Sequence, residues 1–70
     1  MDRYEIIIYW SADDASFVAE VPELAGCLAH GGSHEAALAN AKDAMALWVE
    51  SALADGQPVP KAKGQRLMLA

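Results

Sequence analysis

Apolar and polar residues alternate near the start of the chain in a pattern typical of a β-strand. Residues 4–10, with the sequence YEIIIYW, carry β-branched and aromatic side chains at strand density. Because successive side chains of a strand point to opposite faces, this stretch has one apolar face and one mixed face. The apolar face, which we expect to meet the core, consists of Tyr4, Ile6, Ile8 and Trp10.

Two further short strands are predicted. Asp13 and Asp14 interrupt the apolar pattern between residues 11 and 15, which indicates a hairpin loop. The second strand then covers Ser16–Val21 and ends at Pro22, which lacks a backbone donor. Its inward side chains are predicted to be Phe17, Ala19 and Val21, and its outward ones Ser16, Val18 and Glu20. After a turn, a short third strand is predicted at Cys27–His30.

A long amphipathic helix is predicted after the third strand. Gly31 and Gly32 permit the sharp change from strand to helix, and Ser33 is placed to cap the first turn. The helix is expected to run to about Ala54, with Gly56 beyond its end as a stop signal. Apolar residues at steps of three and four form one stripe that we expect to pack on the sheet. The stripe consists of Leu38, Ala41, Met45, Trp48 and Ala52.

The order of these elements defines the expected fold class. Arg66–Ala70 alternates enough for a final strand, which gives the order β-β-β-α-β. We therefore predict an α+β protein with a small antiparallel or mixed sheet and one helix packed on one face. Nothing in this chain covers the opposite face, so either charged side chains keep it solvated or a second copy packs on it; we expect the second, as a homo-oligomer (dimer or tetramer). That face would hold Ile7, Tyr9, Val18 and Met68.

Length and charge narrow the classes of function. The 70 residues make one small domain, residues 1–70, with a thin core. Folding hides only about 60% of the surface that so short an unfolded chain exposes. Ten acidic residues against five basic ones give a formal net charge of −5. Such a chain repels nucleic acid and attracts a basic protein, although acidity for solubility alone explains the charge equally well.

The single cysteine, Cys27, cannot form an internal disulfide, which favours a reducing cytoplasm. Together with His30 and His34 it could be written as a metal-binding motif. Structural zinc takes four protein ligands, however, and the sequence offers no fourth cysteine or histidine. The apolar neighbours of Cys27 suggest a small core thiol and not a nucleophile. The acidic residues do not assemble a two-metal nuclease site, so we predict no metal, no cofactor and no catalytic residue.

No apolar stretch approaches the roughly 20 residues that span a bilayer, so no membrane association is expected.

The run VPELAGCLAHGGS, residues 21–33, and the helix that follows resemble the HicB-like antitoxin family. The matching positions are Pro22, Leu24, Gly26, Cys27, Gly31, Ser33, Glu35, Ala37, Leu38, Gly56 and Pro60. The sequence departs from the family pattern at Glu23, where aspartate is usual, at Ala25, where proline is usual, and at Ala36, where a capping glutamate is usual. The resemblance covers nearly the whole chain and implies a partial ribonuclease H-like fold.

The resemblance implies an antitoxin of a type II toxin–antitoxin system, which is not an enzyme. Such proteins bind a small basic HicA-type toxin, an endoribonuclease, and block its RNA surface. The acidic residues expected to contact the toxin, at one loop end, are Asp13, Asp14, Glu20 and Glu23. Family members commonly continue into a DNA-binding segment, whereas nothing follows Ala70, so we expect no C-terminal DNA-binding domain and no direct DNA binding. The alternative is an orphan HicB-like oligomeric scaffold or small-ligand-binding domain without a toxin.

Overall fold

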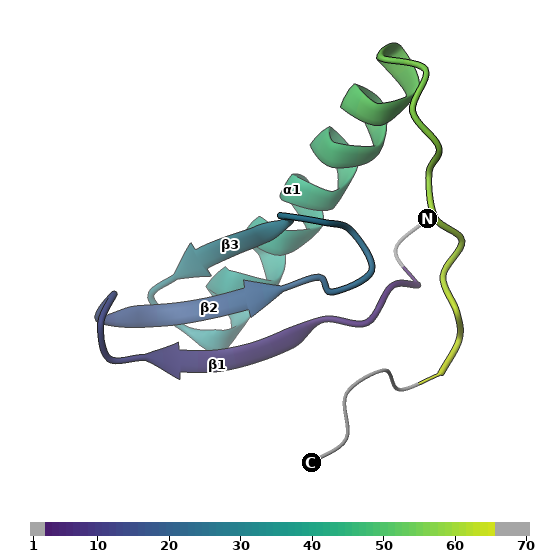
Figure 1. Cartoon of the computed structure of the whole chain (residues 1–70). Helices are drawn as coiled ribbons and strands as arrows, with labels where there is room; N and C mark the ends of the chain where they lie inside the picture. The colour runs from purple at the N-terminus through teal and green to yellow at the C-terminus, as the bar shows by residue number, and fades with distance from the viewer. Residues whose placement is uncertain (1–2, 66–70) are drawn as a thin grey trace.

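Three strands followed by one helix build the protein. The structure, a computed structural model, describes residues 3–65. Its elements are β1 (Ile7–Ser11), β2 (Ser16–Glu20), β3 (Leu28–Gly31) and α1 (His34–Ala54). They form two layers, with α1 lying across one face of the sheet (Figure 1). The predicted α+β fold class is therefore confirmed.

The expected final strand, with Met68, lies outside the described residues. The partial ribonuclease H-like character, of which that strand is a part, stays a prediction.

The sheet is antiparallel throughout, with the strand order β1-β2-β3. Ile7 at the start of β1 lies opposite Glu20 at the end of β2. The turn between the two strands closes when the backbone N–H of Ala15 donates to the carbonyl of Ala12 at 3.3 Å, with Ala15 at a positive φ of 49°. The hairpin loop predicted at residues 11–15 is confirmed, and its two strands differ from their predicted bounds only at the ends.

The helix begins and ends where the sequence predicts. Ser33 is the N-cap, and its hydroxyl oxygen accepts a hydrogen bond from the backbone N–H of Ala36 at 3.0 Å. Gly56 follows the last turn with a positive φ of 69°, which a residue without Cβ adopts at no cost. The opening of α1 lies very close to the end of β3. A Cβ on Gly31 would lie only 2.4 Å from the backbone nitrogen of Ala37. Glycine is therefore required at this position by a close approach of backbones.

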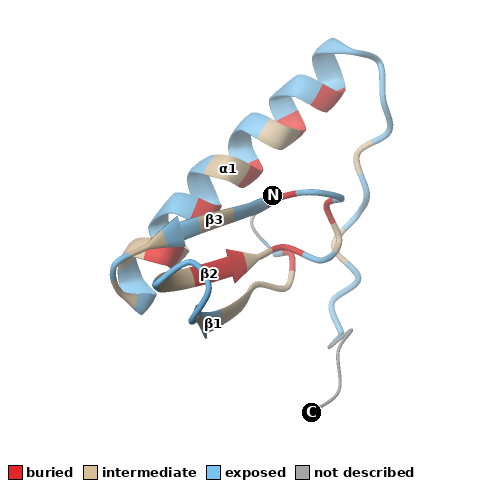
Figure 2. Cartoon of the chain, turned by 60° about the vertical axis from the view of Figure 1, so that its left-hand side comes forward, coloured by how far each residue is buried: buried red, intermediate tan, exposed pale blue. Residues whose placement is uncertain are grey.

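The face of α1 that meets the sheet differs slightly from the predicted stripe. Its buried residues are Ala37, Ala41, Met45, Val49 and Ala52, and Figure 2 shows them along one side of the helix. Leu38 and Trp48 were expected in this stripe but lie at its margin, where they are half-buried. The periodicity thus predicted the correct side of α1. At two of the five positions the buried residue is the neighbour of the predicted one, Ala37 in place of Leu38 and Val49 in place of Trp48.

Two clusters of buried side chains form the core. One holds Ala19 of β2 with Ala37 and Ala41, three small residues that let the two layers lie close together. The other lies between the loop that follows β2 and the middle of α1. It consists of Tyr4, Val21, Leu24, Cys27 and Met45, with Trp48 packed against it. Alanine burial contributes little per residue, so most of the apolar stabilisation comes from this second cluster.

Two expectations about the sheet need correction. Trp10 was expected in the core, yet 55% of its surface is exposed. The reason is that α1 packs mainly on β3 and β2 and leaves the end of β1 uncovered, where Trp10 contacts Phe17 edge to face. Val18 was expected to be uncovered on the opposite face, yet it is only 3% exposed. It lies in the central strand between Tyr9 and His30, whose larger side chains flank it in register.

Candidate functional site

The four acidic residues expected to contact a partner lie in different parts of the hairpin and its loops. Asp13 and Asp14 are exposed in the turn between β1 and β2. The carboxylate of Asp14 accepts from the Ser11 hydroxyl at 3.0 Å and lies 3.3 Å from Nε2 of His30. Asp14 is therefore held against the outer face of the sheet, which is the face opposite α1, whereas no such contact is recorded for Asp13.

Glu20 lies at the other end of the outer face. Its carboxylate accepts a hydrogen bond from the Tyr9 hydroxyl at 2.7 Å. This hydrogen bond raises the pKa of Tyr9 above its ordinary value of 10.0, with a smaller contribution from the charge of Asp14. Tyr9 is thus hydrogen-bonded to Glu20 on the outer face, and the negative charge of Asp14 acts on its hydroxyl in the same direction.

Glu23, in the loop between β2 and β3, accepts two backbone hydrogen bonds that hold distant segments together. One carboxylate oxygen accepts from the backbone N–H of Glu5 at 3.0 Å, and the other accepts from the backbone N–H of Lys63 at 2.9 Å. The hydrogen bond from Glu5 is the main reason why the pKa of Glu23 lies below its ordinary value of 4.5. Glu23 therefore fastens the segment before β1 and the segment after α1 to the same loop. The Tyr4 hydroxyl adds a second link when it donates to the carbonyl of Pro60.

These positions do not bring the four acidic residues together at one loop end. Ser11 pairs with Ser16 beside the turn that carries Asp13 and Asp14, while Glu20 ends the opposite side of the hairpin. At about 3.3 Å per residue, a five-residue strand separates the two ends by roughly 13 Å. Asp14 and Glu20 share the outer face, and Glu23 belongs to the loop. Whether these residues contact a partner stays a prediction.

The three residues considered as a metal motif are also apart. Cys27 is buried in the core cluster, and burial raises the pKa of its thiol above the ordinary value of 9.0, which favours the unreactive protonated form. His30 lies on the outer face beside Asp14, and the His34 ring packs on Phe17 with centroids 4.1 Å apart. Within residues 3–65, no group of three or more metal-ligating side chains is arranged to hold an ion.

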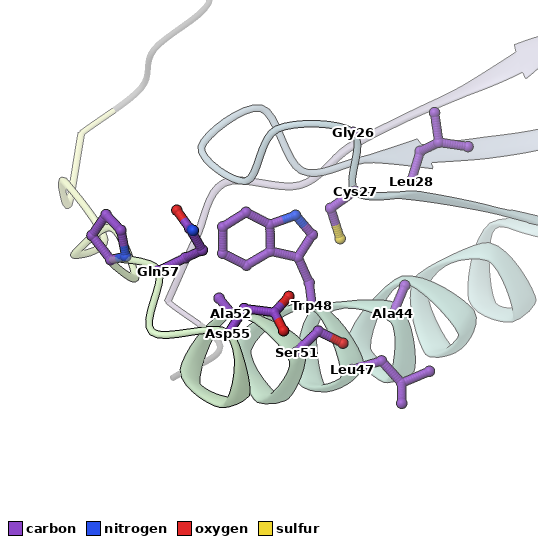
Figure 3. Close-up of a pocket in the computed structure, with 11 residues that line it drawn as sticks. Gly26, Cys27, Leu28, Ala44, Leu47, Trp48, Ser51, Ala52, Asp55 and Gln57 are labelled. Atoms are coloured by element: carbon purple, nitrogen blue, oxygen red, sulfur yellow. The ribbon is translucent and has the colours of Figure 1, made fainter.

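Sequence reasoning missed a groove of about 600 Å³ between the start of β3 and the second half of α1 (Figure 3). Its lining is mainly apolar and includes Gly26, Cys27, Leu28, Ala44, Leu47, Trp48, Ser51, Ala52, Asp55, Gln57 and Pro58. The Trp48 indole rises from the helix toward the loop that carries Cys27, as Figure 3 shows. Its N–H donates to the carbonyl of Ala25 at 2.9 Å, which fixes the ring as one wall of the groove. The signal available in the sequence was Leu47, an apolar residue on the polar side of the predicted stripe.

The loop that forms the roof of this groove is closed by backbone hydrogen bonds. The N–H of Val21 donates to the carbonyl of Cys27, and the N–H of Cys27 donates to the carbonyl of Leu24, both at 3.0 Å. Gly26 has a positive φ of 75°, which allows the tight reversal between them. The groove is therefore bounded by an ordered loop on one side and by a helix on the other.

Comparison with known proteins assigns the chain to a family. Residues 4–68 match the family described as HicB_like antitoxin of bacterial toxin-antitoxin system. A UPF0150 protein from Synechocystis is 39% identical over 63 residues, which cover 90% of this chain and 85% of that protein. A second Synechocystis UPF0150 protein is 42% identical over 48 residues, covering 69% of this chain and 61% of that protein. A UPF0150 protein from Thermoplasma acidophilum is 29% identical over 65 residues, 93% of each chain.

This chain therefore belongs to the HicB-like antitoxin family, and the resemblance inferred from the sequence is confirmed. Membership supports an antitoxin role with a toxin partner of some kind and favours a binding role over an enzymatic one. No solved structure shows significant similarity to the chain. The helix in the described part of the chain does not have the continuous apolar length needed to cross a bilayer.

Proposed function

We propose that this protein is the antitoxin of a type II toxin–antitoxin pair and neutralises a small basic HicA-type endoribonuclease by binding it. The observation that carries the proposal is the family match over residues 4–68. The net charge of −5 supports a basic partner, because opposite charge speeds encounter and favours the correct pairing. The protein acts by occlusion and carries out no catalysis.

Co-expression tests this function. The candidate toxin, a small basic protein to be sought among the genes adjacent to this one, is expressed in a bacterial host with and without the antitoxin chain. We expect growth arrest by the basic protein alone, rescue by co-expression, and a complex that survives affinity purification and gel filtration. Toxicity that is unaffected by the chain, together with separate elution of the two proteins, would remove the proposal.

We propose that the acidic residues Asp13, Asp14, Glu20 and Glu23 contribute to attracting the toxin. Glu20 is the most suitable position for a test, because its carboxylate accepts an exposed hydrogen bond from the Tyr9 hydroxyl and holds no backbone segment in place. A Glu20→Lys variant should bind the toxin more weakly, and the loss should shrink as salt is raised. Glu23→Lys is a poor test, because it also breaks the two backbone hydrogen bonds that Glu23 accepts. Unchanged affinity of the Glu20→Lys variant at low salt would exclude this acid from the contact.

We further propose that the antitoxin works in the cytoplasm as a homo-oligomer, a dimer or a tetramer. The free thiol of Cys27 fits a reducing compartment. The outer face of the sheet, with Tyr9 and Leu28 both exposed, supplies apolar surface for self-association. Light scattering on the purified chain gives the mass directly, and a monomer at micromolar concentration would exclude the oligomer.

A second candidate function is a small-ligand-binding or scaffold domain without a toxin. The observation that favours it is the groove beside Trp48, whose volume of about 600 Å³ lies in the range of small-molecule sites. Native mass spectrometry of the protein from its own host would detect a retained ligand. A ligand bound in the absence of any toxin partner would favour this candidate.

A further inference from the structure

The groove between β3 and α1 is apolar inside and acidic at its border. Leu47 is 64% exposed at the groove. On a helix, residues three and four positions apart are surface neighbours, so Leu47 stands next to Asp43 and Glu50. Asp55 is the charged residue among those that line the groove. An exposed leucine surrounded by carboxylates is suited to a partner that combines apolar and basic groups.

The helix itself adds negative potential at the same place. The last turn of α1, all of it within the described residues, contains no basic residue. The carbonyls of Ala52 and Leu53 accept hydrogen bonds from the backbone N–H groups of Gln57 and Gly56, but the helix dipole still places about half a negative charge at this end, which a nearby Lys or Arg would normally offset. Here Asp55 occupies the C-cap position and adds a full negative charge. The groove therefore opens at the uncompensated negative end of α1.

The groove is continuous with the acidic outer face of the sheet. A smaller hollow of about 230 Å³ shares Gly26, Cys27 and Leu28 with the groove and has Glu20 in its own lining. Leu28 is the cross-strand partner of Glu20. It is also 46% exposed, so an apolar side chain connects the two hollows at the surface. The acid on the sheet and the acid at the end of α1 thus lie at two borders of one surface.

We propose that this groove is the toxin-docking site, and that it receives an apolar side chain of the toxin flanked by Lys or Arg. The inference rests on the proposed antitoxin function and specifies which surface of the antitoxin binds the toxin. Leu47 and Trp48 would make the apolar contacts, with Glu20 and Asp55 as the acidic border. Tryptophan walls with a polar border are typical of positions that dominate protein–protein affinity.

A second copy of this chain is a poorer occupant of the groove. In a two-fold dimer the same patch meets itself, and this patch offers the acids Glu20 and Asp55 but no basic side chain to pair with them. Charge complementarity therefore favours the basic partner here and leaves self-association to the outer face of the sheet.

Two leucines on the same helix provide a matched test. Leu47 lines the groove, whereas Leu53 is equally exposed, at 65%, and does not line it. Leu47→Lys and Leu53→Lys change the net charge of the antitoxin identically. The probe is the purified candidate toxin from the co-expression experiment, and calorimetry measures its dissociation constant. We expect at least a tenfold weaker complex for Leu47→Lys, whereas Leu53→Lys, which places a cation in the last turn of α1, should weaken binding by less than threefold at low salt and leave it unchanged at high salt.

Each other outcome is decisive. If the wild-type chain binds the basic protein and the two lysine variants bind it equally well, the groove is not the docking site although the antitoxin function stands. If the wild-type chain does not bind it, the proposed function fails and the inference fails with it. Leu47→Lys that changes the oligomeric mass but not toxin affinity would assign the groove to a second copy. Displacement of a retained small ligand with unchanged toxin affinity would assign it to that ligand.

A second variant covers the case in which Leu47→Lys disturbs folding. Asp55→Asn removes the charge at the groove border with little change in shape. It should weaken toxin binding about threefold or more at low salt and much less at high salt, because screening reduces the contribution of an exposed charge. Circular dichroism checks that each variant melts like the wild-type chain. An Asp55→Asn complex with wild-type affinity at low salt would contradict the acidic border.

Discussion

The junction between β3 and α1 offers the sharpest test of how this small protein is held together. Gly31 and Gly32 are adjacent, and neither adopts a positive φ. A Cβ on Gly31 would meet three backbone atoms of α1 at 2.4, 2.7 and 2.8 Å. A Cβ on Gly32 would have nothing within 4 Å. The same substitution at the two positions therefore separates a packing clash from any general effect of replacing glycine.

The size of the clash sets the expected loss of stability for Gly31→Ala. Carbon contacts are most favourable at about 3.5–4.0 Å, so the helix and β3 must move apart by about 1 Å. Backbone atoms on both sides cannot rotate away as a side chain would. Overpacking typically costs about 1–3 kcal/mol and occasionally more, and we expect about 3 kcal/mol here. A domain of this length has a total stability of about 4–10 kcal/mol, so the loss is a large fraction of it.

Urea unfolding followed by circular dichroism and by tryptophan fluorescence measures the difference. For a small domain the slope is about 1 kcal/mol per molar urea, so the Gly31→Ala midpoint should fall by roughly 3 M, or the folded baseline should be lost. Gly32→Ala should be neutral or more stable by about 0.4–1 kcal/mol, because alanine restricts the unfolded chain. Equal midpoints for the two variants would refute the close approach of β3 and α1.

Two further perturbations test local contacts. Ser33→Ala removes the hydroxyl that accepts from the Ala36 N–H and should lower the free energy of unfolding by about 1 kcal/mol in urea titrations; no change would mean that the cap does not form in solution. Glu23→Gln should weaken the attachment of Glu5 and Lys63 and lower the melting temperature at neutral pH. Because the pKa of Glu23 is lowered by folding, its contribution is fully present above the ordinary value of 4.5 and is lost as the pH falls through the folded value. The variant should therefore show a smaller loss of melting temperature than the wild-type chain on acidification below pH 4.5, and parallel pH profiles would contradict this role of Glu23.

The sequence was most informative where local rules decide the structure. Ser33 and Gly56 define the two ends of α1 because capping and a left-handed stop depend on residues within one turn of the helix end. Asp13 and Asp14 mark the hairpin turn for the same kind of reason. The family resemblance followed from these joints, since its characteristic residues are those of the loop and the helix start.

Local sequence patterns could not predict features that depend on how α1 and the loops pack on the sheet. Alternation puts Trp10 on the face toward α1, but only the position of the helix over β3 and β2 leaves that side chain exposed. Val18 shows the reverse case, because neighbours in register bury it without a second layer. The groove was missed since it depends on how the loop after β2 stands over the second half of α1. Glu23 looked like a surface acid because its two backbone donors are far away in the sequence.

The two backbone hydrogen bonds accepted by Glu23 also bear on the order in which the protein folds. Its donors stand 18 and 40 positions away along the chain, and the contact from Tyr4 to Pro60 spans 56. Contacts between such distant positions close large loops and tend to form late, after the hairpin and the helix have already met. The segments on either side of the sheet–helix unit should then be the first to open in the native state. Hydrogen exchange would detect this as early loss of protection at the amides of Glu5 and Lys63, while the amides of α1 remain protected until global unfolding.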